Sequence, residues 1–163
     1  MLELAIVMLI VGILAATATP TFFNSLMYHR AESAARRLKA DIKQLQQTAR
    51  RTSRAQSMSF VGSTYTLSSD VVGLNRASEP YTVDLSGSPY EMDRVSFDFG
   101  GETTLAFDGY GMPSSGGTAV LLIGTHKRTL TLNGNTGQIT ITAERQSDDQ
   151  PSVPPDGAMG GIP

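Results

Sequence analysis

The residues that could carry catalysis are few and scattered in this chain. Five carboxylates lie on predicted strands and turns of the second half, where a nearby pair could act as general acid and base: Asp84, Glu91, Asp93, Asp98 and Asp108. His126 lies in a predicted hairpin turn, so we expect an exposed imidazole rather than a catalytic one. The sequence contains no GxSxG, HExxH or phosphate-binding loop. The pattern therefore predicts a protein that is not an enzyme.

The metal-binding residue types are also sparse. The chain has no cysteine, which excludes a disulfide and a thiolate-bound metal, and its two histidines, His29 and His126, are far apart in the sequence. The segment NGNTG at residues 133–137 fits a hairpin turn better than a calcium loop. We therefore expect neither a metal site nor another cofactor.

Glu3 is an acid at the start of an otherwise uncharged apolar run, where it could pair with a cation. An acid in a membrane-length segment costs about 2.5 kcal/mol or more near the bilayer centre, and less at the edge. Its carboxylate either reaches the interface or meets a partner's cation, and charge placement alone favours neither. Gly12 and Pro20, eight residues apart in the same run, produce either a tolerated kink or a segment that bends and unwinds.

The element that carries these three residues is a long apolar helix. No charged residue lies between Leu4 and Tyr28, and these 25 positions span roughly 38 Å as a helix. That length exceeds a bilayer core of about 30 Å, so residues 1–28 are predicted to be a transmembrane half. A cleaved signal peptide is the alternative, but no basic region precedes the run and Pro20 directly follows the possible cleavage site.

The helix is predicted to continue to about residue 56 as an amphipathic half. Small and apolar side chains recur at three- and four-residue steps and form one face: Ala31, Ala34, Ala35, Leu38, Ile42, Leu45 and Ala49. Basic side chains occupy the other faces: Arg36, Arg37, Lys39, Lys43, Arg50 and Arg51. The apolar face must pack on another element.

After Ser57 the pattern becomes that of an antiparallel sheet. Short alternating segments, rich in aromatic and β-branched residues, are separated by Gly, Pro, Asn and Ser. They predict six or seven antiparallel strands, with turns at His126–Lys127 and at NGNTG. With the helix on one face of the sheet, the fold class is α+β. Residues 29–143 are the predicted globular head, and residues 144–163, rich in Pro and Gly, a flexible tail.

Charge is divided unevenly along the chain. Residues 30–54 contain eight basic and two acidic residues, whereas the residues from Thr66 onward contain five basic and twelve acidic ones. The basic helix face is either a solvated surface, a nucleic-acid contact or a surface that meets an acidic neighbour. Nucleic acid is the weaker alternative because no aromatic residues are interleaved with the basic ones.

The segment LELAIVMLIVGILAATATPTFF resembles the N-terminal segment of type IV pilins and of type II secretion pseudopilins. The acid, the glycine nine positions later and the proline eight further on fall where the family has them. The segments RRLKADIKQLQQTARRTSRAQSMSF, LAFDGYGMPSSGGTAVLLIG and KRTLTLNGNTGQITI are similar to the GspH/FimT group of minor pilins. The first match covers residues 1–23, and the second, looser one covers roughly residues 30–142.

The resemblance implies a type IV pilin-like fold and a structural subunit, a minor pilin or pseudopilin that supports protein secretion or pilus biogenesis. Glu3 would neutralise the methylated N-terminal amine of an adjacent subunit. The stretch from Gly12 to Pro20 would lose helicity in the filament, and Leu4 to Ala18 would form the filament core. Other pilin subunits, prepilin peptidase and an assembly platform are the implied partners. A DNA-binding minor pilin for DNA uptake and a major subunit of a pilus-like filament are the alternatives.

The resemblance also implies an order of locations. The chain would first span the bacterial inner membrane once, with its head in the periplasm, and would then enter a periplasmic or extracellular filament. Family precursors carry a basic leader, whereas this sequence starts at Met1, two residues inside the expected mature N-terminus. We expect that the start codon was placed late or that the chain was trimmed.

Overall fold

The computed structural model describes residues 2–68 and 81–145, with side chains at all of these positions except 2 and 13–21. Within these residues one long helix, α1 (Leu2–Thr52), precedes the strands. The described strands are β1 (Gln56–Val61), β2 (Thr64–Leu67), β3 (Thr82–Asp84), β4 (Arg94–Asp98), β5 (Thr104–Phe107), β6 (Gly117–Ile123), β7 (His126–Leu132) and β8 (Ile139–Arg145).

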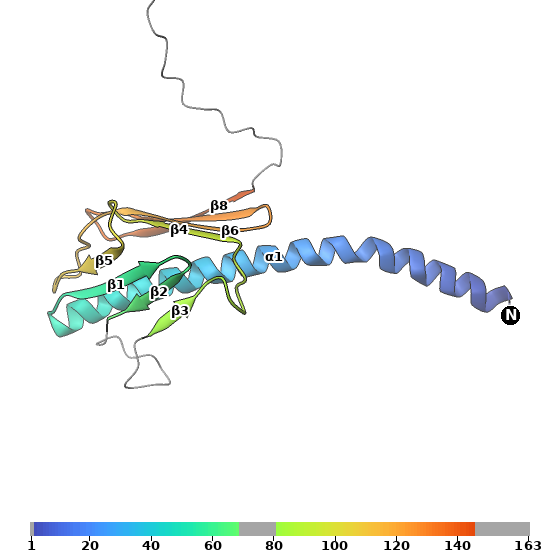
Figure 1. Ribbon diagram of the computed structural model, residues 1–163, viewed down its shortest axis with the longest axis horizontal. Coiled ribbons are helices and arrows are strands. Elements are labelled where there is room, and N and C mark those ends of the chain that lie inside the picture. The colour runs from blue at the N-terminus through green and yellow to red at the C-terminus, as the bar shows by residue number, and fades with distance from the viewer. Residues whose placement is uncertain (1, 69–80, 146–163) are drawn as a thin grey trace, which may run out of the picture.

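The two halves of α1 have different surroundings. The C-terminal half packs inside the head, whereas the N-terminal half extends away from it and changes direction along its length (Figure 1). The predicted apolar face is confirmed, because all seven of its side chains, from Ala31 to Ala49, are fully buried. Within residues 2–68 and 81–145, no helix combines the length and the hydropathy that a membrane span requires.

The helix ends at Thr52, four residues earlier than predicted. Ser53 has a left-handed φ of 51°, and the amide of Arg54 donates to the carbonyl of Ala49 at 3.3 Å. This is the Schellman arrangement, in which a left-handed residue after the last turn reverses the chain. Serine occupies the left-handed position here, so the glycine that usually marks a helix end is missing from the sequence.

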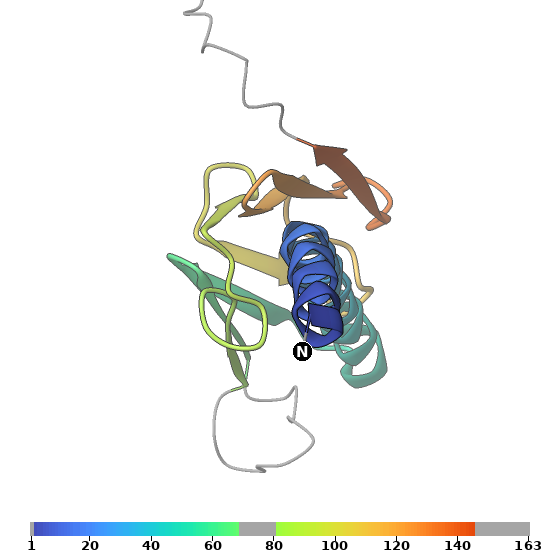
Figure 2. The ribbon, with the colours of Figure 1, turned by 90° about the vertical axis from the view of Figure 1, so that its right-hand side faces the viewer.

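The described strands form two antiparallel four-stranded sheets rather than the single predicted sheet. One has the order β3-β2-β1-β5 and the other β4-β6-β7-β8. Figure 2 looks along α1 and shows the helix between the two sheets, with β7 and β8 above it and β1 and β2 to its left. The ring of Phe60 stacks on those of Phe97 and Phe99, with centroids 4.4 and 5.1 Å apart, and thereby joins the sheets. The α+β class with antiparallel pairing is confirmed.

Two turns between central strands differ from the prediction. The segment SMSFVGSTYTL at residues 57–67, which the alternation predicts as a single segment, holds two strands, β1 and β2, joined at Gly62, whose φ is +59°. The turn between β6 and β7 lies at Gly124 and Thr125, two residues before the predicted position. His126 therefore begins β7, and its side chain is only 8% exposed, so the expectation of an exposed imidazole is wrong.

The last hairpin agrees with the prediction. The side-chain oxygen of Asn133 accepts from the amides of Asn135 and Thr136 at 2.9 and 3.0 Å, which builds the NGNTG turn. β8 then pairs with β7 over its whole length and continues to Arg145. The first two residues of the expected tail thus belong to a strand, and residues 146–163 lie outside the described residues.

Candidate assembly surface and the contacts that position it

The N-terminal half of α1 presents an apolar surface that the head does not cover (Figure 1). Its large side chains are about half exposed or more: Leu4, Ile6, Val7, Met8, Leu9, Ile10, Val11, Phe22 and Phe23. An exposed apolar surface of this extent marks a place that a membrane or another protein covers. The exposed half of the helix is therefore the first part of the candidate site.

The three assembly residues predicted from the sequence all lie in this half. Glu3 is exposed in the first turn of α1, and no ion pair with Glu3 occurs among the described residues. A Cβ atom added at Gly12 would meet nothing within 4 Å. Pro20 lies within α1, but its side chain is outside the described ones. Their roles in assembly stay predictions.

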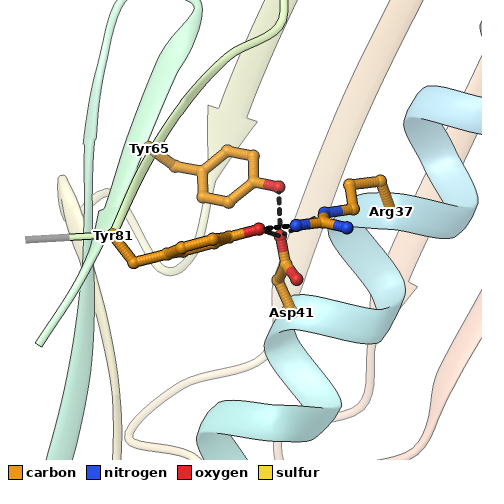
Figure 3. Close-up of polar contacts among 4 residues, drawn as sticks. All are labelled: Arg37, Asp41, Tyr65 and Tyr81. Carbon is orange, nitrogen blue, oxygen red and sulfur yellow. Dashed lines mark hydrogen bonds and ion pairs between the residues drawn. The ribbon is translucent and has the colours of Figure 1, made fainter. Parts of the chain in front are cut away.

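A buried carboxylate attaches α1 to the first sheet in what we call the Asp41 cluster (Arg37, Asp41, Tyr65 and Tyr81; Figure 3). Asp41 Oδ2 accepts from the Tyr65 hydroxyl at 2.6 Å, from Arg37 Nε at 3.2 Å and from the Tyr81 hydroxyl at 3.3 Å. Arg37 also donates to the Tyr81 hydroxyl and lies over the Tyr81 ring, 5.5 Å from its centre. The cluster joins the helix to β2 and to the residue before β3.

Burial controls the protonation of this cluster. Asp41 is only 3% exposed, and this desolvation raises its pKa, while the bond from Tyr65 and the charge of Arg37 act in the opposite direction. Burial and the neighbouring Asp41 carboxylate raise the pKa of Tyr65 far above its usual value. Tyr65 therefore acts as the donor in its hydrogen bond to Asp41.

A buried arginine attaches α1 to the second sheet in the Glu32 cluster (Tyr28, Glu32, Arg36 and Arg128). Arg128 in β7 is 2% exposed, and its Nε donates to Glu32 Oε2 at 2.9 Å. The other oxygen of Glu32 accepts from Arg36 Nε at 2.7 Å, and Tyr28 covers the Arg128 guanidinium at 4.8 Å from the ring centre. The hydrogen bonds from Arg36 and Arg128 lower the pKa of Glu32.

His126 lies beside the Glu32 cluster. Its ring meets that of Tyr28 edge to face, with centroids 5.9 Å apart. Burial lowers the pKa of His126, and the charges of Arg145 and Arg128 lower it further. Burial and these charges thus disfavour the protonated imidazole, which packs against Tyr28 where the helix leaves the head.

The candidate acid–base carboxylates are engaged in separate turns. Asp84 accepts from the amide of Ser86, Asp93 from that of Gly124 and Asp98 from that of Gly101, at 2.8, 2.6 and 3.1 Å. Glu91 pairs with Arg30, and Asp108 belongs to the loop described below. In the part of the chain that the structure describes, no three His, Asp or Glu side chains are placed to hold a metal ion.

The six residues of the predicted basic face divide into two sets. Three bind within their own chain: Arg36 to Glu32, Arg37 to Asp41, and Arg50 to the carbonyl of Tyr110. Lys39, Lys43 and Arg51 make no hydrogen bond or ion pair among the described residues, so their charges stay available to a partner.

The loop between β5 and β6 packs on the C-terminal end of α1, and we call residues 108–112 the distal loop. Asp108 Oδ1 accepts from the amides of Tyr110 and Met112 at 3.0 and 2.8 Å. Two helix side chains bind the loop, since Gln46 Nε2 donates to the carbonyl of Gly111 at 2.9 Å and Arg50 Nε donates to that of Tyr110 at 3.0 Å. The backbone of the distal loop is thus fixed by Asp108 from within the loop and by Gln46 and Arg50 from α1.

The two clusters and the distal loop were not predicted, although signals for some of them are present. Asp41 is a single acid among basic residues next to the apolar helix face. Arg128 alternates with Leu130 and Leu132, which places it on the buried face of its strand. The partners Tyr65 and Glu32 have no such local signal, because their contacts cross large sequence separations.

No protein-family model matches the chain, and no curated protein gives a significant match. Two crystal forms of the type IV minor pilin FimU of Pseudomonas aeruginosa have a similar structure. The first is 18% identical, with a TM-score of 0.55 over 72% of this chain and 95% of that one. The second is 17% identical, with a TM-score of 0.50 over 71% and 98%. At this identity the likeness concerns the fold.

Proposed function

We propose that this chain, which has the type IV pilin fold, is a non-enzymatic subunit of a type IV pilus or of a type II secretion pseudopilus. The observation that carries the proposal is the division of α1: one half packs in the head, and the other is exposed and apolar, with Glu3 in its first turn. A head of this kind keeps its own core, while the exposed half must be covered by other chains.

Helix packing would supply most of the affinity between subunits. Burying one large apolar side chain from water contributes about 1.5–3 kcal/mol, and nine of them are exposed on this half. Before assembly we place this half in the bacterial inner membrane, because residues 4–28 carry no charge. A helix that leaves lipid for a filament core exchanges one apolar surrounding for another, so close helix–helix packing decides the balance.

In the proposed filament Glu3 would set the register of the helices. Its carboxylate would neutralise the N-terminal amine of a neighbouring subunit, inside an apolar surrounding where an unpaired acid is costly. Such a pair contributes more free energy than an exposed ion pair, which contributes about 0.2–1 kcal/mol, because little water screens it. Misaligned helices would leave the acid unpaired and would be rejected.

The free cations of the helix would orient neighbouring heads. Lys39, Lys43 and Arg51 face away from their own core, and the head beyond residue 66 carries a surplus of acids. Each exposed pair contributes only about 0.2–1 kcal/mol, which suits a contact that adjusts orientation rather than one that drives assembly. We assign these residues to subunit contacts rather than to nucleic acid because no exposed aromatic residues alternate with them.

The remaining parts of the proposal follow from the sequence resemblance. The head would lie in the periplasm while the helix spans the membrane, and prepilin peptidase and an assembly platform would process and insert the chain. The assembled filament would be periplasmic in secretion or extracellular as a pilus, and the subunit would be a minor one.

Replacing Glu3 tests this function. Glu3→Ala should reduce the amount of the chain in sheared filaments at least tenfold, while the same amount remains in the membrane fraction and resists carbonate extraction. Glu102→Ala is the matched control, because Glu102 is an exposed acid of the head. Normal incorporation of the Glu3→Ala variant, or loss of its folded head, would contradict the proposed role of Glu3.

A further inference from the structure

The distal loop is built to hold one side chain in solvent. Glycine is required on both sides of Tyr110: a Cβ at Gly109 would lie 2.8 Å from the backbone of Ser53, and one at Gly111 would lie 2.3 Å from Arg50. The loop therefore rests directly on the end of α1, and Gly111 has a φ of +75° that other residues rarely adopt. Between these glycines the Tyr110 side chain is 85% exposed.

An exposed aromatic ring on a fixed backbone is a favourable contact for a partner. The amide of Tyr110 donates to Asp108 and its carbonyl accepts from Arg50, so little backbone entropy is lost when the ring is covered. Beside it lies an open pocket of about 560 Å³ lined by Arg50, Ser53, Asp108, Gly109 and Tyr110. Aromatic and arginine side chains at such pockets dominate many interfaces.

The surroundings of the ring are positively charged. Arg50, Arg51 and Arg54 are exposed around the helix end, and Gly109 packs over the backbone of Ser53 and Arg54. Among the described residues, Asp108 is the acid that lines the pocket, and its Oδ1 already accepts two amides of the loop. A matching partner is anionic and offers rigid apolar surface to the ring.

The chain itself contains a segment of this chemistry. Residues 146–163 follow β8 and include three aspartates, no lysine or arginine, and four prolines: Asp148, Asp149, Asp156, Pro151, Pro154, Pro155 and Pro163. Proline-rich segments favour the extended polyproline II conformation and dock on exposed aromatic side chains at a small entropy cost. We call residues 146–163 the C-terminal segment.

The direction of β8 favours a C-terminal segment from another copy at the distal loop. β8 ends at Arg145, opposite His126, where α1 leaves the head (Figure 1). The distal loop lies at the other end of the head, beyond about 33 Å of helix between Tyr28 and Arg50. The strand thus points away from its own distal loop, and toward the distal end of a subunit placed below it in a filament of parallel helices.

We propose that Tyr110, with Arg50, Arg51 and Arg54, binds the C-terminal segment of a second copy of this chain. The choice of partner rests on the charge complementarity, on the prolines and on the end of the head from which the segment leaves. The arrangement in a filament rests on the proposed function, whereas the binding itself does not require a filament.

Binding is measured with the full chain in detergent and a fluorescein-labelled peptide of residues 146–163, followed by anisotropy. Tyr110→Ala should raise the Kd at least tenfold, and Tyr110→Phe, which keeps the ring, less than twofold. Arg51→Gln should raise it about threefold, whereas Arg94→Gln, the same charge loss at the exposed start of β4, leaves it unchanged. Absence of saturable binding, or a Kd that does not depend on Tyr110, overturns the proposal.

Cross-linking identifies the copy that supplies the segment. The chain lacks cysteine, so any disulfide must join the two cysteines that are introduced. Differently tagged chains carrying Met112→Cys and Ser152→Cys should form a disulfide-linked pair on mild oxidation, and added Tyr110→Ala should reduce it at least fivefold. Val61→Cys, exposed at the end of β1 that lies away from the distal loop, is the control for Met112→Cys and should give background only.

The possible outcomes separate the two proposals. If both cysteines in one chain cross-link only within that chain, the segment binds its own loop and the proposal of a second copy is wrong. If the peptide binds through Tyr110 but the chain never enters filaments, binding of the C-terminal segment is supported and the proposed function is contradicted. If the chain enters filaments but the peptide does not bind through Tyr110, only the binding of the C-terminal segment is contradicted.

Discussion

Removal of the Asp41 carboxylate should destabilise the head strongly, because Tyr65 depends on it. The Tyr65 side chain is fully buried, and the structure gives its hydroxyl the Asp41 carboxylate as acceptor at 2.6 Å. A buried donor left without its charged acceptor costs about 1–3 kcal/mol. Arg37 adds little, because its side chain is 45% exposed and water can replace Asp41. For Asp41→Ala we therefore expect a loss of about 2–3 kcal/mol.

The same reasoning predicts how the stability losses of the single variants rank, and that two of these losses are not additive. Tyr65→Phe removes one donor from a carboxylate that keeps two others, which should cost about 1.5–2 kcal/mol. Tyr81→Phe, at a longer and partly exposed bond, should cost less than about 1 kcal/mol. The double variant Asp41→Ala with Tyr65→Phe should be more stable than the sum of the single losses, because no buried hydroxyl is left without an acceptor.

Urea unfolding of the full chain in detergent, followed by tyrosine fluorescence, measures these differences; the chain has five tyrosines and no tryptophan.

The pH dependence of the unfolding free energy gives a second test of the role of Asp41. Burial raises the folded-state pKa of Asp41, so the folded state binds this proton more tightly than the unfolded state. The parent chain should therefore gain stability relative to Asp41→Asn as the pH falls from 7 to about 4. A loss smaller than about 1 kcal/mol for Asp41→Ala, or the opposite pH trend, would refute the reasoning.

Three further changes probe other parts of the structure. Glu32→Gln removes the charged partner of the buried Arg128 and should cost about 1–3 kcal/mol; because the pKa of Glu32 is lowered, the parent's advantage should disappear as the pH falls below about 4.5. Gly117→Ala should lower the free energy of unfolding by about 3 kcal/mol or more, and the urea midpoint with it, because its Cβ would lie 2.1 Å from the carbonyl oxygen of Asp98. Gly12→Ala meets no neighbour, so the head should unfold within about 0.5 kcal/mol of the parent, and any change should appear only in filament incorporation.

The parts of the fold that repeat along the chain were predictable from the sequence. The buried face from Ala31 to Ala49 follows helical periodicity, and the NGNTG hairpin follows its turn residues. The end of the helix was not predictable in this way, because Ser53 takes a left-handed conformation without the usual glycine. The turn before His126 lies two residues earlier than predicted, although Gly124, with a left-handed φ of 55°, marks it in the sequence.

The parts that depend on distant residues could not be predicted from local pattern. The division into two sheets depends on which strands pair, and alternation within a strand does not specify its neighbour. Tyr65 lies 24 residues from Asp41 and Arg128 lies 96 residues from Glu32, so neither contact leaves a periodic trace. Glu3 and Gly12 were located by their place in an apolar run, and their roles await the filament experiments.

The two attachments of α1 to the head also determine how the molecule carries mechanical load. Tension on a filament would enter each head along α1, which is bonded to one sheet at Glu32 and to the other at Asp41. These residues lie nine positions apart, or about 14 Å along the axis, on different flanks of the helix. Both sheets would therefore resist the pull in parallel and in shear, and withdrawing the helix would require both attachments to break together rather than one after the other.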